Sequence, residues 1–146
     1  MQPGYFCSKK MTAHIVSQFI DHVWNNAGAA DLHPAFVDYS LPPGFPCNAE
    51  GLRQWVALTS ASFEHHTLIE DQVTEGDKSV LRITMRLRHI GTWRDIPPTG
   101  KEVQTRGYRM FRVANGKIIG HWALIDGNAL ENQLRDAMHG CALPQP

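Results

Sequence analysis

Residues 81–89 decide the fold, because in their sequence, LRITMRLRH, apolar side chains alternate with basic or hydroxyl side chains up to the final histidine. A period of two is typical of a β-strand with one buried face. The odd-numbered side chains are expected to face the interior, and Arg86 and Arg88 to face away. The segment therefore predicts a sheet with one apolar side and one basic side.

Turn signals on both sides of this strand predict its neighbours. The stretch Glu75–Lys78 has turn composition, so residues 68–74 are expected to form the other strand of a hairpin. Further along, an Asn-Gly pair joins residues 103–113 to residues 117–125, and this pair is a strong hairpin signal. The sequence thus predicts a meander of about four antiparallel strands.

Helical patterns flank the strands, with apolar residues spaced by three and four. Helices are expected over residues 9–26, after the capping candidate Asn48 and after the capping candidate Asn128. A short pattern at residues 32–36 falls in a first half that is mainly helical. Helices followed by antiparallel strands indicate an α+β fold, in which the sheet curls around a helix and leaves a cone with a pocket at its mouth.

Length and composition narrow the possible functions. The 146 residues fit one domain, over residues 1–146, and the 14 basic side chains balance the 14 acidic ones, which argues against a nucleic-acid partner. No apolar run approaches membrane-spanning length and no leader pattern is visible, so we expect a cytoplasmic protein without a membrane partner. The three cysteines lie too far apart for a zinc or redox motif, so no metal or cofactor is expected.

Two titratable side chains end two apolar strand faces. His89 continues the inward parity of Leu87, and Asp126 ends a stripe that contains Trp122 and Leu124. An aspartate beside apolar side chains is partly desolvated, which raises its pKa and suits a general base. In the alternative interpretation, Asp126 only caps the last helix and His89 only bonds to backbone. His121 has the opposite parity, so we expect it on the far face of the sheet and not in the catalytic site.

Three blocks of sequence resemble a known family. They are RHIGTWRDIPPTGKEV at 88–103, FRVANGKIIGHWALID at 111–126 and NALENQL at 128–134. They resemble the SnoaL-like polyketide cyclases of the NTF2-like, ketosteroid-isomerase-like superfamily. This resemblance implies the NTF2-like cone and cofactor-free closure of a polyketide ring by intramolecular aldol chemistry. It places Asp126 at the acid/base aspartate of the family and His89 at the histidine before the proline loop, whereas Gly120 replaces an acidic residue found in many relatives.

The leading hypothesis is a cyclase in which Asp126 removes a proton between two carbonyls of a polyketide-type ester. The resulting enolate attacks a ketone of the same molecule, and Asp126 or His89 returns the proton. The substrate is expected to be an apolar small molecule that contacts six side chains, namely Trp55, Phe63, Met85, Leu87, Trp122 and Leu124. A homo-oligomer, either a dimer or a tetramer, is also expected, because the outer side of a small cone offers an apolar stripe.

Other hypotheses remain open. An isomerase would need an oxyanion donor such as Tyr39 or Tyr108, and an epoxide hydrolase would need a second carboxylate, for which Asp95 is the candidate. A dehydratase or a non-catalytic binding domain would use the same cone, because one fold can carry unrelated functions.

Overall fold

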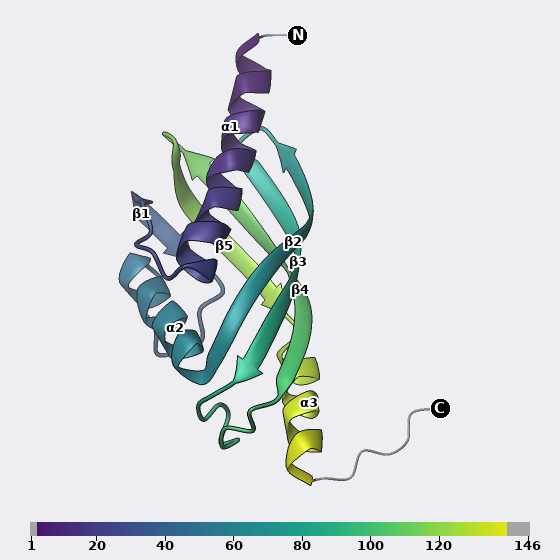
Figure 1. Cartoon of the computed structure of the whole chain (residues 1–146). Coiled ribbons are helices and arrows are strands. Elements are labelled where there is room, and N and C mark those ends of the chain that lie inside the picture. Colours follow the sequence, from purple (N-terminus) through teal and green to yellow (C-terminus); the bar gives the residue numbers. More distant parts are fainter. Residues whose placement is uncertain (1–2, 140–146) are drawn as a thin grey trace.

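The computed structural model describes residues 3–139 of the chain, and the side chains of residues 9–136. Three α-helices, one π-helix and five strands follow one another (Figure 1), in the order α1 Pro3–Phe19, η1 Ile20–Asn25, β1 Leu32–Asp38, α2 Ala49–Ser62, β2 Phe63–Glu75, β3 Lys78–His89, β4 Glu102–Ala114, β5 Lys117–Ile125 and α3 Gly127–His139. In the described part of the chain, no helix combines the length and the apolar character that a membrane crossing requires.

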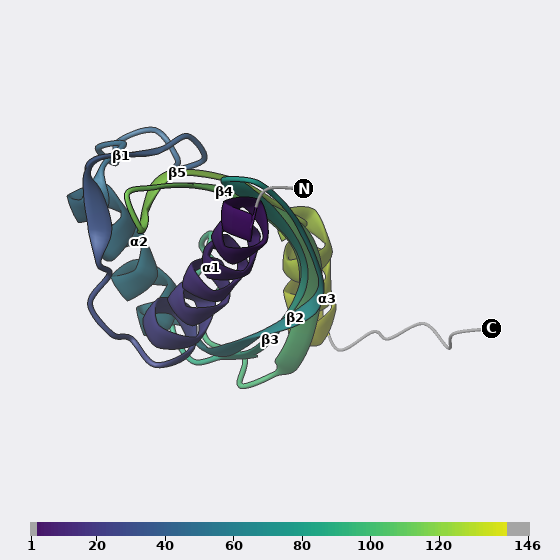
Figure 2. The ribbon, with the colours of Figure 1, turned by 90° about the horizontal axis from the view of Figure 1, so that it is seen from above.

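The five strands form one curled sheet in the order β1-β5-β4-β3-β2. Figure 2 shows that the sheet wraps around α1, while α3 lies outside the curve. The α+β cone that the sequence predicts is therefore confirmed. The sheet is mixed, however, because β1 pairs with β5 in parallel. The mainly helical interpretation of residues 32–36 is thus wrong: they form an edge strand, and an edge position tolerates Pro34.

The predicted β4–β5 hairpin is present, with both loop residues in the left-handed region. Asn115 has a φ of 52° and Gly116 a φ of 75°. Two positive φ values match the right-handed twist of the flanking strands, as in a type I′ turn. The first hairpin also forms, although β2 begins at Phe63 and so extends further than the sequence predicts.

Strand β3 has the predicted parity. Leu81 and Ile83 are fully buried against helix α1 and the rest of the core, while the outward-facing Arg88 pairs with Glu64 at 3.0 Å. Arg86 is exposed as well. The apolar face of this strand thus packs into the core, as the alternation in residues 81–89 predicts.

Strand β5 departs from its predicted parity because of a β-bulge. Ile118 pairs with Val113 and Gly120 with Arg112, so Ile119 is an extra residue on β5. One extra residue moves every following side chain to the opposite face.

The bulge reverses the expected faces of β5. Trp122 is 37% exposed and Leu124 is 81% exposed, so the expectation that these side chains line the interior is wrong. His121 is only 2% exposed and faces the interior, so its expected position on the far face is also wrong. The same shift turns Ala123 and Ile125 inward, and they do not form the outer stripe.

Helix α3 completes the open edge of β4 beyond the end of β5. The side-chain amide of Gln133 donates to the Gln104 carbonyl at 2.8 Å and accepts from its backbone N–H at 3.3 Å. A side-chain amide thereby takes the place of a strand partner. The helix is capped by Asp126 instead of Asn128, because Asp126 Oδ1 accepts from the backbone N–H of Ala129 at 3.0 Å. The residues after His139 lie outside the described part of the chain.

Candidate functional site

An aspartate and a histidine form a buried pair on the inner face of the sheet. Parallel pairing sets Asp38 at the end of β1 opposite His121 on β5. His121 Nδ1 lies 2.9 Å from Asp38 Oδ2, and both side chains are almost fully buried. The other oxygen of Asp38 accepts from the backbone N–H of Ser40 at 3.0 Å and from its hydroxyl at 2.8 Å. Both carboxylate oxygens are therefore hydrogen-bonded.

Arg109 lies on the other side of the histidine and fixes its tautomer. Arg109 Nη1 is 3.3 Å from His121 Nε2. A guanidinium can only donate, so Nε2 accepts and carries no proton. The ring proton is then on Nδ1 and is donated to Asp38. The three side chains thus form a line of cation, neutral imidazole and carboxylate.

Burial and hydrogen bonds explain the charge of each group. Burial lowers the pKa of His121 and the Arg109 charge adds to this effect, whereas the hydrogen bond that His121 donates to Asp38 opposes it. Burial also lowers the pKa of Arg109 to about 10, so the guanidinium stays charged at neutral pH. Burial alone would raise the pKa of Asp38, but hydrogen bonds from His121 and Ser40 hold it below its usual range. A neutral imidazole with a fixed orientation is a suitable general base.

The π-helix η1 positions an aromatic ring and an amide beside this line. The ring of Trp24 lies 4.4 Å from the guanidinium carbon of Arg109. The next residue, Asn25, accepts from the Thr67 backbone N–H at 2.7 Å and donates to its carbonyl at 3.0 Å. The Trp24 ring also meets the ring of His65 edge-on at 6.0 Å. Isolated π-helical turns are frequent at functional sites.

His89 is buried on the inner face, as predicted, but it lies at the other end of the sheet. His121 on β5 pairs with Phe111 on β4, which pairs with Ser79 near the start of β3. His89 is the last residue of β3, ten positions after Ser79. At about 3.3 Å per residue, the two histidines are roughly 30 Å apart along the strand direction.

The contacts of His89 are those of a residue that fixes a loop. Its Nδ1 accepts from the Thr99 backbone N–H at 3.2 Å and lies 3.1 Å from the Thr99 hydroxyl. Burial lowers its pKa. The neutral ring thereby anchors the proline loop of residues 90–101.

Asp126 lies outside the cone and is exposed. Its side chain caps α3, and its carbonyl accepts from the Thr105 hydroxyl at 2.7 Å. Trp122, which stacks on Tyr39 at 4.7 Å, and Leu124 lie on the same outer face. The structure thus separates Asp126 from His89 instead of bringing them together.

Four predicted substrate contacts lie on the inner side of the cone or beside it. Met85, Leu87 and Phe63 are buried, and Phe63 lies 5.3 Å from the ring of His89. Trp55 is half-buried on α2, where it meets Phe45 edge-on at 5.4 Å. These side chains form an apolar wall at the end of the cone that holds His89.

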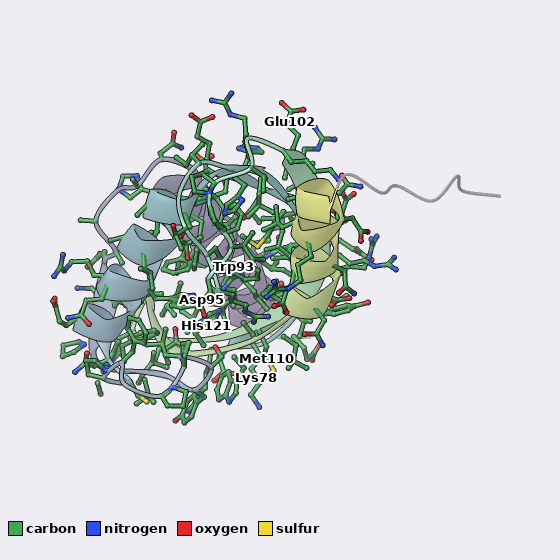
Figure 3. The ribbon with its side chains drawn as sticks, turned by 90° about the horizontal axis from the view of Figure 1, so that it is seen from below. Lys78, Trp93, Asp95, Glu102, Met110 and His121 are labelled. Atoms are coloured by element: carbon green, nitrogen blue, oxygen red, sulfur yellow. The ribbon has the colours of Figure 1, made fainter. Side chains whose placement is uncertain are left out.

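The groups that the alternative hypotheses need are on the surface. Tyr39 and Tyr108 are 59% and 56% exposed. Asp95 is exposed in the proline loop, and Figure 3 shows it near Trp93 between α2 and α3. Two hollows lie on the sheet: one of about 650 Å³ is lined by side chains that include Arg86, and one of about 700 Å³ is lined by side chains that include Tyr108, Leu124 and Asp126. Among the described residues, no group of three His, Cys, Asp or Glu side chains could hold a metal ion.

The sequence interpretation missed Asp38, Arg109 and His121 as a site. One signal was available: in residues 103–113, Arg109 has the same parity as the buried Val103 and Phe111. A charged side chain on a buried strand face indicates a functional or paired group. The bulge at Ile119 and the parallel pairing of β1 have no comparable signal.

One comparison with known proteins identifies a family, and a second finds solved structures with a similar fold. A sequence model described as SnoaL-like polyketide cyclase matches residues 14–134. TsrD from Streptomyces laurentii is 25% identical, with a TM-score of 0.76 over 86% of this chain and 96% of its own. IdmH, a proposed polyketide cyclase from Streptomyces antibioticus, is 25% identical, with a TM-score of 0.76 over 85% of this chain and 98% of its own. No curated protein matches the chain significantly in sequence.

Proposed function

Because the chain belongs to the SnoaL-like polyketide cyclase family, we propose that it closes a ring in a polyketide-type ester by an intramolecular aldol reaction without a cofactor. His121 is the acid/base in this proposal, and Asp38 orients it. The observation that supports this assignment is the neutral imidazole, which two buried hydrogen bonds fix on the inner face of the cone. The substrate is an apolar small molecule with a β-dicarbonyl unit.

The reaction needs one proton acceptor that later becomes a donor. His121 Nε2 takes the proton from the carbon between two carbonyls, and the electron pair of that C–H bond delocalises over the carbonyl oxygens as an enolate. The enolate carbon then forms a C–C bond with a ketone carbon of the same chain. The imidazolium returns its proton to the new alkoxide, so the product is an isomer of the substrate. Asp38 stabilises the transient imidazolium, because its carboxylate accepts from Nδ1.

The cone contributes by orientation. Apolar side chains around His121 on the inner face, including Phe111 and Trp24, can hold a flexible chain in a folded conformation. Bringing the two reacting carbons together in this way can supply several kcal/mol of barrier lowering.

Asp126 and His89 stay in the proposal as the competing acid/base pair that the family resemblance implies. The exposed position of Asp126 and its role as a helix cap favour His121 over it. Both assignments predict a loss of turnover, but at different residues, so one series of variants distinguishes them.

The test compares His121→Gln with Asp126→Asn in an assay that follows a linear polyketide ester by absorbance and mass. A glutamine amide can still donate to Asp38 and accept from Arg109, but it cannot take a proton. We expect turnover to fall about 100-fold or more in His121→Gln and to stay near the wild-type value in Asp126→Asn, which keeps a capping oxygen. Thermal unfolding of both variants serves as the folding control. Full turnover in a folded His121→Gln protein would refute the assignment.

A further inference from the structure

Four buried polar atoms near the guanidinium of Arg109 have no hydrogen-bond partner within the described part of the chain. Three are Arg109 Nε, Trp24 Nε1 and Thr67 Oγ1, on side chains that are between 2% and 4% exposed, and the fourth is Nδ1 of the half-buried His65. Buried polar groups in folded proteins are paired in the large majority of cases, because an unpaired one costs about 1–3 kcal/mol. A group of such atoms in one region therefore indicates a binding site.

The contacts of the neighbouring residues place these side chains in one part of the core. The Arg109 guanidinium lies over the Trp24 ring, and Asn25, the next residue, holds the Thr67 backbone. Burial lowers the pKa of His65, and the positive charge of Arg109 adds to this effect. On the sheet, Thr67 lies between His65 and the level of Arg109. The guanidinium therefore extends toward the strand segment that carries the Thr67 hydroxyl.

The chemistry of the atoms defines what they bind. An arginine Nε–H and an indole N–H can only donate, and a threonine hydroxyl can donate, so the matching ligand atom is an acceptor oxygen. Arg109 is charged, and the nearby Asp38 carboxylate is already hydrogen-bonded to His121 and Ser40. A negatively charged oxygen is the acceptor that compensates a buried cation best.

We propose that Arg109, Trp24 and Thr67 bind the enolate oxygen of a β-dicarbonyl substrate, which makes them an oxyanion site. This inference rests on the proposed function. It extends that proposal by naming the residues that bind the substrate oxygen and the negative charge which that oxygen carries. Donors aimed at an oxygen where negative charge develops lower the barrier to its formation. The site thus favours substrates that are acidic at carbon over simple ketones.

The same site also controls the base. Arg109 Nη1 donates to the lone pair of His121 Nε2 across 3.3 Å, which is long for a hydrogen bond. A substrate oxygen competes for the guanidinium and so frees Nε2 to accept the carbon-bound proton. Because all these groups are buried, the ligand can reach them only when residues that cover them move.

The experiment measures the ionisation of a bound ligand at equilibrium, without turnover. The probe is acetylcyclopentanone, a β-diketone whose enolate absorbs at longer wavelength than its neutral form, and ethylcyclopentanone is the control with one carbonyl. We expect the diketone to ionise about one pH unit or more lower when bound than when free, which is tenfold in the equilibrium constant. We expect Arg109→Gln to remove this shift. A folded wild-type protein that does not bind the diketone, or binds it with unchanged ionisation, would overturn the inference.

Two less disruptive substitutions provide the same test if Arg109→Gln folds poorly. Thr67→Val and Trp24→Phe each remove one donor that has no partner in the described part of the protein, so neither should lower the stability of the ligand-free protein through a lost hydrogen bond. Each should weaken enolate binding about tenfold while leaving the affinity for ethylcyclopentanone unchanged. Unchanged enolate binding in both folded variants would show that these donors do not form the site.

The test of the oxyanion site can be distinguished from the test of His121 as the acid/base. His121→Gln retains the three donors, so it should keep the ionisation shift of the diketone even though its turnover is lost. Turnover that depends on His121 without any ionisation shift would refute the oxyanion site alone. A shift without any dependence of turnover on His121 would refute the acid/base assignment alone.

Discussion

His121 donates its Nδ1 proton to Asp38 across 2.9 Å, and this bond joins residues that are 83 positions apart in the sequence. It forms because β1 pairs in parallel with β5 and because the bulge at Ile119 turns His121 inward. The carboxylate also compensates the charge of Arg109, which is fully desolvated on the far side of the imidazole. One local irregularity in a strand thus creates the buried polar line.

Replacing Asp38 by asparagine should reduce both activity and stability. The change removes the negative charge that stabilises an imidazolium at His121, so we expect turnover to fall about 100-fold or more. The buried Arg109 charge loses its compensation, which should lower the free energy of unfolding by about 3 kcal/mol. Denaturant unfolding and the cyclisation assay measure the two effects. A variant with wild-type stability and turnover would show that the pair has neither role.

Stability should decrease in mild acid. Burial lowers the folded-state pKa values of His65, His89 and His121, so the unfolded chain binds protons first as the pH falls. The free energy of unfolding should therefore be constant above about pH 7 and fall below about pH 6.5, by up to about 1.4 kcal/mol per pH unit for each histidine.

Chemical unfolding at several pH values measures this dependence. His121→Gln removes one of the three groups, so its stability should fall less steeply in acid than that of the wild-type protein. A wild-type stability that rises as the pH is lowered through this range would contradict the buried, neutral state of these side chains.

The fold could be predicted from periodicity, whereas the site could not. The alternation in residues 81–89 and the Asn-Gly turn place β3, β4 and β5 correctly, because strand periodicity and turn chemistry are local properties. Asp38 and His121 become neighbours only through a parallel pairing between distant segments. A bulge is set by how two strands fit together, so a strictly alternating interpretation of β5 put Trp122 and Asp126 on the wrong side.

The outer face of the sheet should form a homo-oligomer, most simply a two-fold dimer. The exposed Leu124, Tyr108 and Trp122 lie on this face, and Tyr39 stacks on Trp122. Covering such a patch with a second copy buries apolar surface on both chains. We expect light scattering to give a multiple of 16.4 kDa for the wild-type protein and the mass of one chain for Leu124→Glu. A wild-type protein that is monomeric at micromolar concentration would refute this expectation.

The exchange of a substrate proton for solvent deuterium reports most directly on the acid/base role of His121, because it detects proton removal before any ring closes. A β-ketoester is incubated in deuterated water with the wild-type protein, His121→Gln or Asp126→Asn, and magnetic resonance follows loss of the proton between its carbonyls. We expect exchange above the uncatalysed rate with wild type and Asp126→Asn, and a loss of about 100-fold or more of this acceleration in His121→Gln. Exchange that persists in folded His121→Gln and disappears in Asp126→Asn would show that His121 is not the base and would return the acid/base role to the outer-face carboxylate.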